Sequence, residues 1–219
     1  MTANLLKTII YSAAAVFYLL ILVLCFASPA TAKKINTGIH KVMLVLSEIA
    51  LALMIVIVFI TVVLRYCFNT GIGWAEEVPR LLVNFFAFCA CAIGVRDHLH
   101  ISVNIFYNLF AKGGIVRKCL DVLYNLAILA CAVFMFIYGT QYSANQFFQG
   151  GQLPMTGWGT YIRYIPAAIA GFVMIFDTIL FLTHTLTIDD LLYSEKEVDY
   201  TEMLKQNKAE AAMQTSDAN

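Results

Sequence analysis

The stretch that decides the fold of this chain is Val42 to Leu64, which reads VMLVLSEIALALMIVIVFITVVL. It contains a single charged side chain, that of Glu48. A helix needs about 20 predominantly apolar residues to cross the hydrocarbon core of a bilayer. The stretch meets this requirement, which predicts a membrane-spanning helix.

The composition of the whole chain also indicates a membrane protein. Of its 219 residues, 61% are hydrophobic and 13% are charged, and the mean hydropathy is +0.78. This is more apolar surface than a water-soluble domain carries. The formal net charge is zero and the cationic residues are dispersed, so the chain lacks the basic patch of a nucleic-acid-binding protein. We therefore expect the lipid bilayer as its surroundings and no nucleic acid partner.

Three further apolar stretches predict spans of the same kind: Leu81–Val95, Leu120–Tyr142 and Tyr161–Leu186. The first of these three is short unless it includes Val78 and Pro79. Proline is tolerated in the first turn of a helix, where its missing N–H is not needed. We expect an all-α membrane protein in which residues 33–186 form four core transmembrane helices.

A fifth apolar stretch, Ile9–Ala27, opens two interpretations of the amino terminus. The small residues from Ser28 to Ala32 are similar to a signal peptidase site, so the stretch could be a cleaved leader. The apolar core of a leader usually has about 7 to 15 residues, and this stretch is longer. The length favours a retained extra helix within residues 1–32, and cleavage is the alternative.

Basic residues are divided unevenly between the two ends of the predicted spans. One set precedes the first and third core spans and consists of Lys33, Lys34, Lys41, Lys112, Arg117 and Lys118. The other loops offer mainly Arg65, Arg80 and Arg163. Because loops rich in Lys and Arg stay in the cytoplasm, the first set predicts the cytoplasmic side. Cleavage of the amino-terminal stretch would export Lys33, so charge also favours its retention.

Two segments outside the spans have their own character. Residues 98–112 are apolar but interrupted by polar side chains, which predicts an interfacial amphipathic helix. Residues 187–219 are acidic and have few large apolar side chains towards their end. We expect them to form a solvated cytoplasmic tail.

Glu48 and Asp177 place carboxylates inside predicted spans. A charged side chain at membrane depth costs at least about 2.5 to 3.5 kcal/mol on insertion scales. The two acids could mark a proton or ion path, or they could be interhelical hydrogen-bonding groups whose partners are His184, Arg96 or another subunit. The second interpretation is favoured, because a relay would need further acids near the middle of the membrane.

The four histidines raise the alternative of a haem- or quinone-binding anchor of a redox complex. Axial haem ligands must face each other from neighbouring helices. His98 and His100 lie beyond the end of a predicted span and His40 precedes another, so the sequence offers no such pair. We expect no cofactor and no metal. No nucleophile with a base, phosphate-binding loop or string of metal ligands is present, so an enzyme is not expected.

Small side chains predict where helices approach closely. One set, on the second core span, consists of Ala87, Cys91 and Gly94. The other set, on the last span, consists of Ala167, Ala170 and Gly171. Each set lies on one side of its predicted helix, so we expect both to face neighbouring helices.

The segment that joins the first two core spans, Arg65 to Arg80, reads RYCFNTGIGWAEEVPR. Arg65, Glu76, Glu77 and Arg80 are two cations and two anions at one membrane face, able to neutralise each other through charge-assisted hydrogen bonds. Tyr66 and Trp74 suit the aromatic belt of a membrane interface. Such a cluster fixes either the fold of this chain or its contact with another subunit.

This segment resembles the small membrane subunit of the tripartite ATP-independent periplasmic (TRAP) transporters. That family shows an Arg-Tyr pair at the end of a helix, then an aromatic residue, a Trp-x-Glu-Glu step and an Arg. The segment from Gly94 to Ile101, with Arg96 and His100, is similar to a second part of the pattern. A weaker third part runs from Gly151 to Pro154 and on through Trp158, Tyr161 and Pro166. The extra helix at Ile9–Ala27 departs from the four-helix pattern.

The resemblance implies a partner subunit without a substrate site. In such systems a periplasmic binding protein delivers an organic acid to a large multispan transport subunit, which is driven by a sodium gradient. The small subunit is a fixed scaffold in the bacterial inner membrane. By this resemblance, the residues expected to hold the structure or the subunit interface are Arg65, Tyr66, Trp74, Glu76, Glu77, Arg80, Arg96 and His100.

Overall fold

A computed structural model describes residues 3–97 and 115–186. These residues form the long helices α1 (Ala3–Ala27), α2 (Pro29–Cys67), α3 (Trp74–Arg96), α5 (Ile115–Gln149) and α6 (Ile165–Leu182). A short 3-10 helix, η1 (Thr160–Arg163), precedes α6. Among the described residues, five helices are long and apolar enough to cross a membrane. The prediction of an all-α membrane protein with an extra amino-terminal helix is confirmed.

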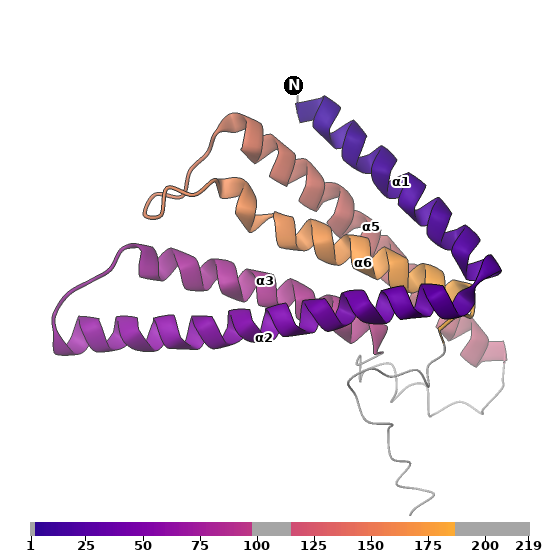
Figure 1. Ribbon diagram of the computed structural model, residues 1–219, viewed down its shortest axis with the longest axis horizontal. Helices are drawn as coiled ribbons and strands as arrows, with labels where there is room; N and C mark the ends of the chain where they lie inside the picture. The colour runs from indigo at the N-terminus through magenta and orange to yellow at the C-terminus, as the bar shows by residue number, and fades with distance from the viewer. Residues whose placement is uncertain (1–2, 98–114, 187–219) are drawn as a thin grey trace, which may run out of the picture.

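The helices form two antiparallel pairs, α2 with α3 and α5 with α6, and α3 packs against α6 (Figure 1). Helix α1 contacts α2, α5 and α6. Towards its amino terminus it diverges from α2 and stays beside α5, where the Tyr11 hydroxyl donates to the Ile137 carbonyl (3.1 Å) (Figure 1). The α2–α3 and α5–α6 connections lie at one end of the bundle. The α1–α2 turn and the carboxyl end of α6 lie at the other (Figure 1).

Helix α2 is much longer than the apolar stretch that predicted it. It begins at Pro29, one residue after the break at Ser28, and ends at Cys67. Proline disfavours a helical residue before it and is accommodated in the first helical turn, which explains the break. The expected start at Val42 was therefore late, and the boundary between residues 32 and 33 falls inside α2. The apolar stretch marked only the most apolar part of this helix.

One stripe of α2 faces the neighbouring helices. Asn36, His40, Met43, Ser47 and Ala50 are buried and recur at intervals of three and four residues. The half-buried residues of the same stripe continue it as Met54, Ile57, Thr61 and Leu64. Intervals of three and four residues are the spacing of helices that pack side by side along their length. The stripe therefore keeps α2 and α3 together through the membrane.

Helices α5 and α6 approach each other closely through small residues. A Cβ atom added at Gly171 would lie 2.5 Å from the backbone nitrogen of Phe136, and one added at Gly139 would lie 2.7 Å from that of Ala168. Ala132 and Ala170 are buried in the same contact. The small-residue face predicted on the last span is therefore a packing face.

The small-residue face predicted on the second core span is wrong. Ala87 and Cys91 are exposed, whereas Cys89, Ala92 and Val95 belong to the core. Small residues lie on both sides of α3, so side-chain size alone did not identify the packed side. The packed side of α3 is the side that contacts α2 and α6.

Candidate functional site

Glu77 anchors the connection between α5 and α6. Its Oε1 accepts a hydrogen bond from the backbone N–H of Met155 (3.1 Å), and its Oε2 accepts one from that of Thr156 (2.9 Å). The Thr156 hydroxyl donates a third bond to Oε2 (2.9 Å). Glu77 is buried in the first turn of α3. A single carboxylate thus fixes two successive amides of a distant loop.

A second bond from α3 holds the same connection. The Asn84 side chain donates to the carbonyl oxygen of Arg163 (2.6 Å). Within the loop, Leu153 donates to the carbonyl of Trp158 (2.7 Å), and Gly157 supplies the positive φ of 71° that the turn requires. We call Glu77, Asn84, Thr156 and Arg163 the loop anchor. A hollow of about 400 Å³ lies beside it, lined by Trp74, Val78, Met155, Thr156 and Trp158.

The structure separates Glu77 from the other charged residues of its segment. Arg65, Glu76 and Arg80 are exposed, and no ion pair joins these residues to one another or to Glu77 within residues 3–97 and 115–186. Tyr66 and Trp74 are also exposed, as residues of an interfacial belt would be. Glu77 bonds to the 150–159 loop instead, because the loop amides need an acceptor when they pack against α3.

Replacing Glu77 by Ala should loosen the 150–159 loop. The amides of Met155 and Thr156 lose their acceptor, so their hydrogen exchange should accelerate by about tenfold or more, as expected when local opening becomes easier. Exchange followed by mass spectrometry measures this directly. Glu76→Ala is the matched control, since that neighbouring side chain is exposed and makes no hydrogen bond to the loop. Equal exchange in both variants would contradict the anchoring role.

A second polar cluster lies near the opposite end of the bundle. Asp177 of α6 accepts hydrogen bonds from the Asn36 side chain (2.5 Å) and from His40 Nε2, 2.9 Å from Oδ1 and 3.1 Å from Oδ2. Asn36, His40 and Asp177 are each fully buried. A buried carboxylate is tolerated only when donors surround it. The cluster therefore joins α2 to α6.

Arg96 extends this cluster to α3. Its Nε donates to Asn36 Oδ1 (3.0 Å), and its Nη1 pairs with Asp97 Oδ1 (3.0 Å). Arg96 and Asp97 are both buried. We call Asn36, His40, Arg96, Asp97 and Asp177 the buried polar cluster. The cluster contains two carboxylates and one guanidinium, and its hydrogen bonds connect α2, α3 and α6.

The sequence predicted one member of this cluster, Asp177, as an interhelical hydrogen-bonding group. Asp177 is such a group and accepts from His40 and Asn36, and the expected partner Arg96 donates to Asn36. The other expected partner, His184, lies exposed just beyond α6. Asn36 and His40 were missed because they precede the apolar stretch. Their spacing, which continues the buried stripe at Met43, was the available signal.

The remaining predicted site residues have different outcomes. Glu48 is exposed on α2 and has no hydrogen bond or ion pair among the described residues. His100 and the predicted interfacial helix of residues 98–112 lie outside the described residues, as does the tail of residues 187–219. No group of three or more potential metal ligands occurs in the described parts of the chain. Of the predicted site residues, Glu77, Arg96 and Asp177 make hydrogen bonds to other elements of this chain.

Comparison with known proteins identifies the family. Residues 54–187 match the family described as tripartite ATP-independent periplasmic transporters, DctQ component. A TRAP transporter small permease protein of Haemophilus influenzae is 31% identical over 140 residues, covering 62% of this chain and 82% of that protein. The ectoine TRAP transporter small permease protein TeaB of Halomonas elongata is 22% identical over 171 residues, with 78% and 88% covered. The C4-dicarboxylate TRAP transporter small permease protein DctQ of Vibrio cholerae is 31% identical over 80 residues, with 36% and 32% covered.

The family match agrees with the structure at several points. It begins within α2 and includes α3, α5 and α6, so it covers the loop anchor and Asp177. Helix α1 lies before it. The segment Arg65 to Arg80, which carried the resemblance in the sequence, falls inside it. This chain belongs to the DctQ family of TRAP transporter small permease subunits and is a multi-pass, non-enzymatic membrane subunit of a transporter.

Proposed function

We propose that this chain is the stationary scaffold subunit of an uptake system for organic acids, and that it supports a large multispan transport subunit. The observation that carries the proposal is the buried polar cluster. Its members are tied to one another across α2, α3 and α6, with Asp177 already satisfied by His40 and Asn36. Groups held this way fix helices in place, whereas a moving substrate or ion site needs ligands that can be released.

The transported solute belongs, in this proposal, to the class of small organic acids. Two relatives are named for solutes that carry carboxylates, ectoine in one and C4-dicarboxylates in the other. A periplasmic binding protein would capture the solute and present it to the large subunit. The coupling is proposed to be an ion gradient, most simply of sodium. This chain would contribute no ligand to either the solute or the ion.

We place the chain in the bacterial inner membrane with its basic end in the cytoplasm. Lys33 and Lys34 follow the α1–α2 turn, and the carboxyl end of α6 lies at the same end of the bundle (Figure 1). Arg65, Arg80 and Arg163 lie towards the other end, on or beside the connecting loops. The positive-inside rule then puts the loop anchor outside and residues 187–219 inside. An odd number of spans puts a retained amino terminus outside.

The exposed charges near the α2–α3 connection are proposed to face the partner subunit. Arg65, Glu76 and Arg80 have no ion-pair partner within the described chain, and charged groups at the rim of an interface favour the correct encounter. Glu77 instead supports this chain's own loop. Arg96 supports the chain's own helices, and His100 keeps its proposed place at the interface as a prediction.

Reconstitution tests the scaffold role. We expect proteoliposomes that contain the large subunit, the binding protein and this chain to take up a radiolabelled organic acid when a sodium gradient is applied. Vesicles without this chain should take up at most about a tenth as much, because the large subunit loses its support. Vesicles with this chain alone should take up none. Uptake or ion conduction by this chain alone would contradict the proposal and indicate an autonomous channel.

A further inference from the structure

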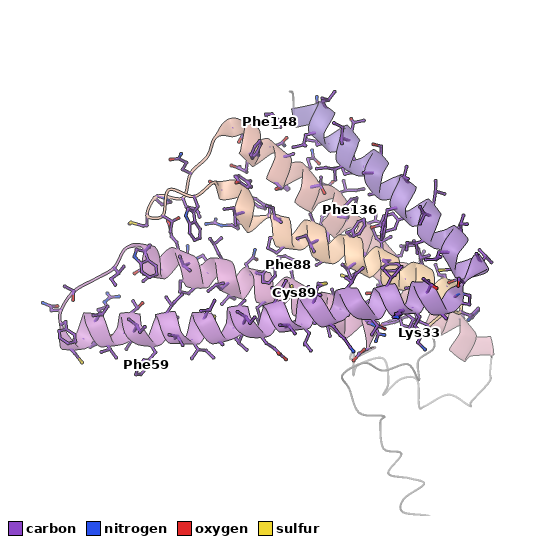
Figure 2. All side chains as sticks on the ribbon, viewed as in Figure 1. Lys33, Phe59, Phe88, Cys89, Phe136 and Phe148 are labelled. Carbon is purple, nitrogen blue, oxygen red and sulfur yellow. The ribbon has the colours of Figure 1, made fainter. Side chains whose placement is uncertain are left out.

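The side of α2 that faces away from α3 carries a continuous exposed stripe. Its members recur at intervals of three and four residues and include Lys41, Val45, Glu48, Ile55, Phe59 and Tyr66. Each is exposed, and Figure 2 shows Phe59 on the side of α2 away from the bundle. This outer stripe lies opposite the buried stripe that packs on α3, and it has the same spacing. It therefore has the form of a second helix-packing seam, and no helix of residues 3–97 or 115–186 covers it.

Glu48 distinguishes the outer stripe from ordinary lipid-facing surface. It is the one charged residue between Val42 and Leu64, and it lies two helical turns, about 10 Å, beyond Lys41 along α2. It is exposed and has no partner in the described chain. A charged side chain in this position is costly when it faces lipid. A protein surface that supplies a donor would remove that cost.

The dimensions and charge of the outer stripe identify its occupant. From Lys41 to Tyr66 it extends about 37 Å, enough for a complete membrane span to lie along it. A second copy of this chain in the same orientation would bring its own Glu48 to the same depth, and two carboxylates would repel each other. The occupant must therefore be a different helix, and one with a donor or cation near the cytoplasmic third of its span.

We propose that a transmembrane helix of the large transport subunit docks on the outer stripe, and that a Lys, Arg or His side chain of that helix pairs with Glu48. This inference rests on the proposed function, which supplies the partner, and adds the surface and the chemistry of the contact. The apolar residues of the stripe supply the packing, and the ion pair fixes the register along the seam. The same division of roles occurs in coiled coils, where one polar contact specifies alignment.

Photo-crosslinking tests the location. A photoreactive amino acid is placed at Ile55 or Phe59 on the outer stripe, and at Leu53 or Ile60 on a different side of α2, in the tagged chain coexpressed with the large subunit. Ile55 and Leu53 are matched, with 57% and 50% of their surfaces exposed. We expect crosslinks to the large subunit from the first pair and not from the second.

The outcomes separate this inference from the proposed function. Crosslinks only from Leu53 and Ile60, or equally from all four sites, would overturn the outer stripe while leaving the scaffold role intact. Crosslinks between two copies of this chain would overturn the proposed occupant, and none from any site would indicate lipid on the stripe. Failure of the unmodified tagged chain to retain the large subunit at all would overturn the proposed function itself.

Glu48→Leu tests the ion pair because the two explanations predict opposite results. If Glu48 faces lipid, leucine removes a cost and the complex is retained. If it pairs with the large subunit, leucine leaves a buried cation unpaired, and we expect about a tenfold or greater loss of the copurified large subunit. Glu48→Gln should lose less, because its amide oxygen still accepts a hydrogen bond. Unchanged copurification in Glu48→Leu, with the chain itself folded, would overturn the proposed pair.

Discussion

Replacing Asp177 by Ala should destabilise the bundle by about 3 to 5 kcal/mol, the loss expected when one partner of a buried charged pair is removed. Asp177 is fully buried and accepts bonds from both Asn36 and His40. Without it, the Asn36 amide and the His40 Nε2 lose a hydrogen-bond partner while both side chains are fully buried. Reversible unfolding in mixed detergent, followed by circular dichroism, measures the free energy difference.

Thr178→Val is the matched control for this substitution. Thr178 adjoins Asp177 and is also buried, but among the described residues its hydroxyl bonds to the Met174 carbonyl of its own helix (2.8 Å) and to no other helix. We expect a loss of about 1 kcal/mol or less. A double-mutant cycle between Asp177→Ala and His40→Ala should give a coupling of about 1 to 3 kcal/mol. Additive effects of the two substitutions would show that this bond does not hold α2 to α6.

The second large effect is expected from Gly171→Val. Its Cβ would lie 2.5 Å from the Phe136 nitrogen and 2.8 Å from the Ala132 carbonyl oxygen, both of which belong to backbone and cannot rotate away. Helices α5 and α6 must separate to admit the side chain. We expect a loss of about 3 kcal/mol, the upper part of the range for overpacked cores. The same unfolding measurement tests it.

Gly94→Ala provides the control for glycine replacement in this protein. Gly94 also lies inside a helix, but an added Cβ there meets nothing within 4 Å. Alanine is the better helix former by about 1 kcal/mol, so this variant should be as stable as the natural chain or more stable. Equal destabilisation by Gly171→Val and Gly94→Ala would contradict close packing of α5 on α6.

The sequence predicted the number and approximate position of the transmembrane helices because hydropathy depends on each stretch alone. It placed spans where α1, α2, α3, α5 and α6 occur. It placed the start of α2 too late, because the residues before Val42 are polar and their helical structure contributes nothing to an apolar pattern. Their helix is stabilised by contacts of Asn36 and His40 with α3 and α6.

The sequence did not predict which polar groups of the site pair with each other. Glu77 and Asp177 were both recognised as important, but their partners come from segments far along the chain, Met155 and Thr156 for the first and Asn36 and His40 for the second. Such contacts depend on which helices are neighbours in the folded chain. The segment Arg65 to Arg80 indicated the family because its residue types and spacing are local features, readable without knowing which side chains meet.

Affinity purification of the tagged chain in mild detergent tests the central claim, that this subunit is a non-catalytic partner of a large transport subunit. Mass spectrometry identifies the copurified proteins, and an absorption spectrum of the same eluate detects a pigment. We predict a colourless eluate that contains a multispan transport subunit in stoichiometric amount. A chain recovered without such a subunit, and with the absorption of haem or with bound quinone, would contradict the account and indicate a redox anchor.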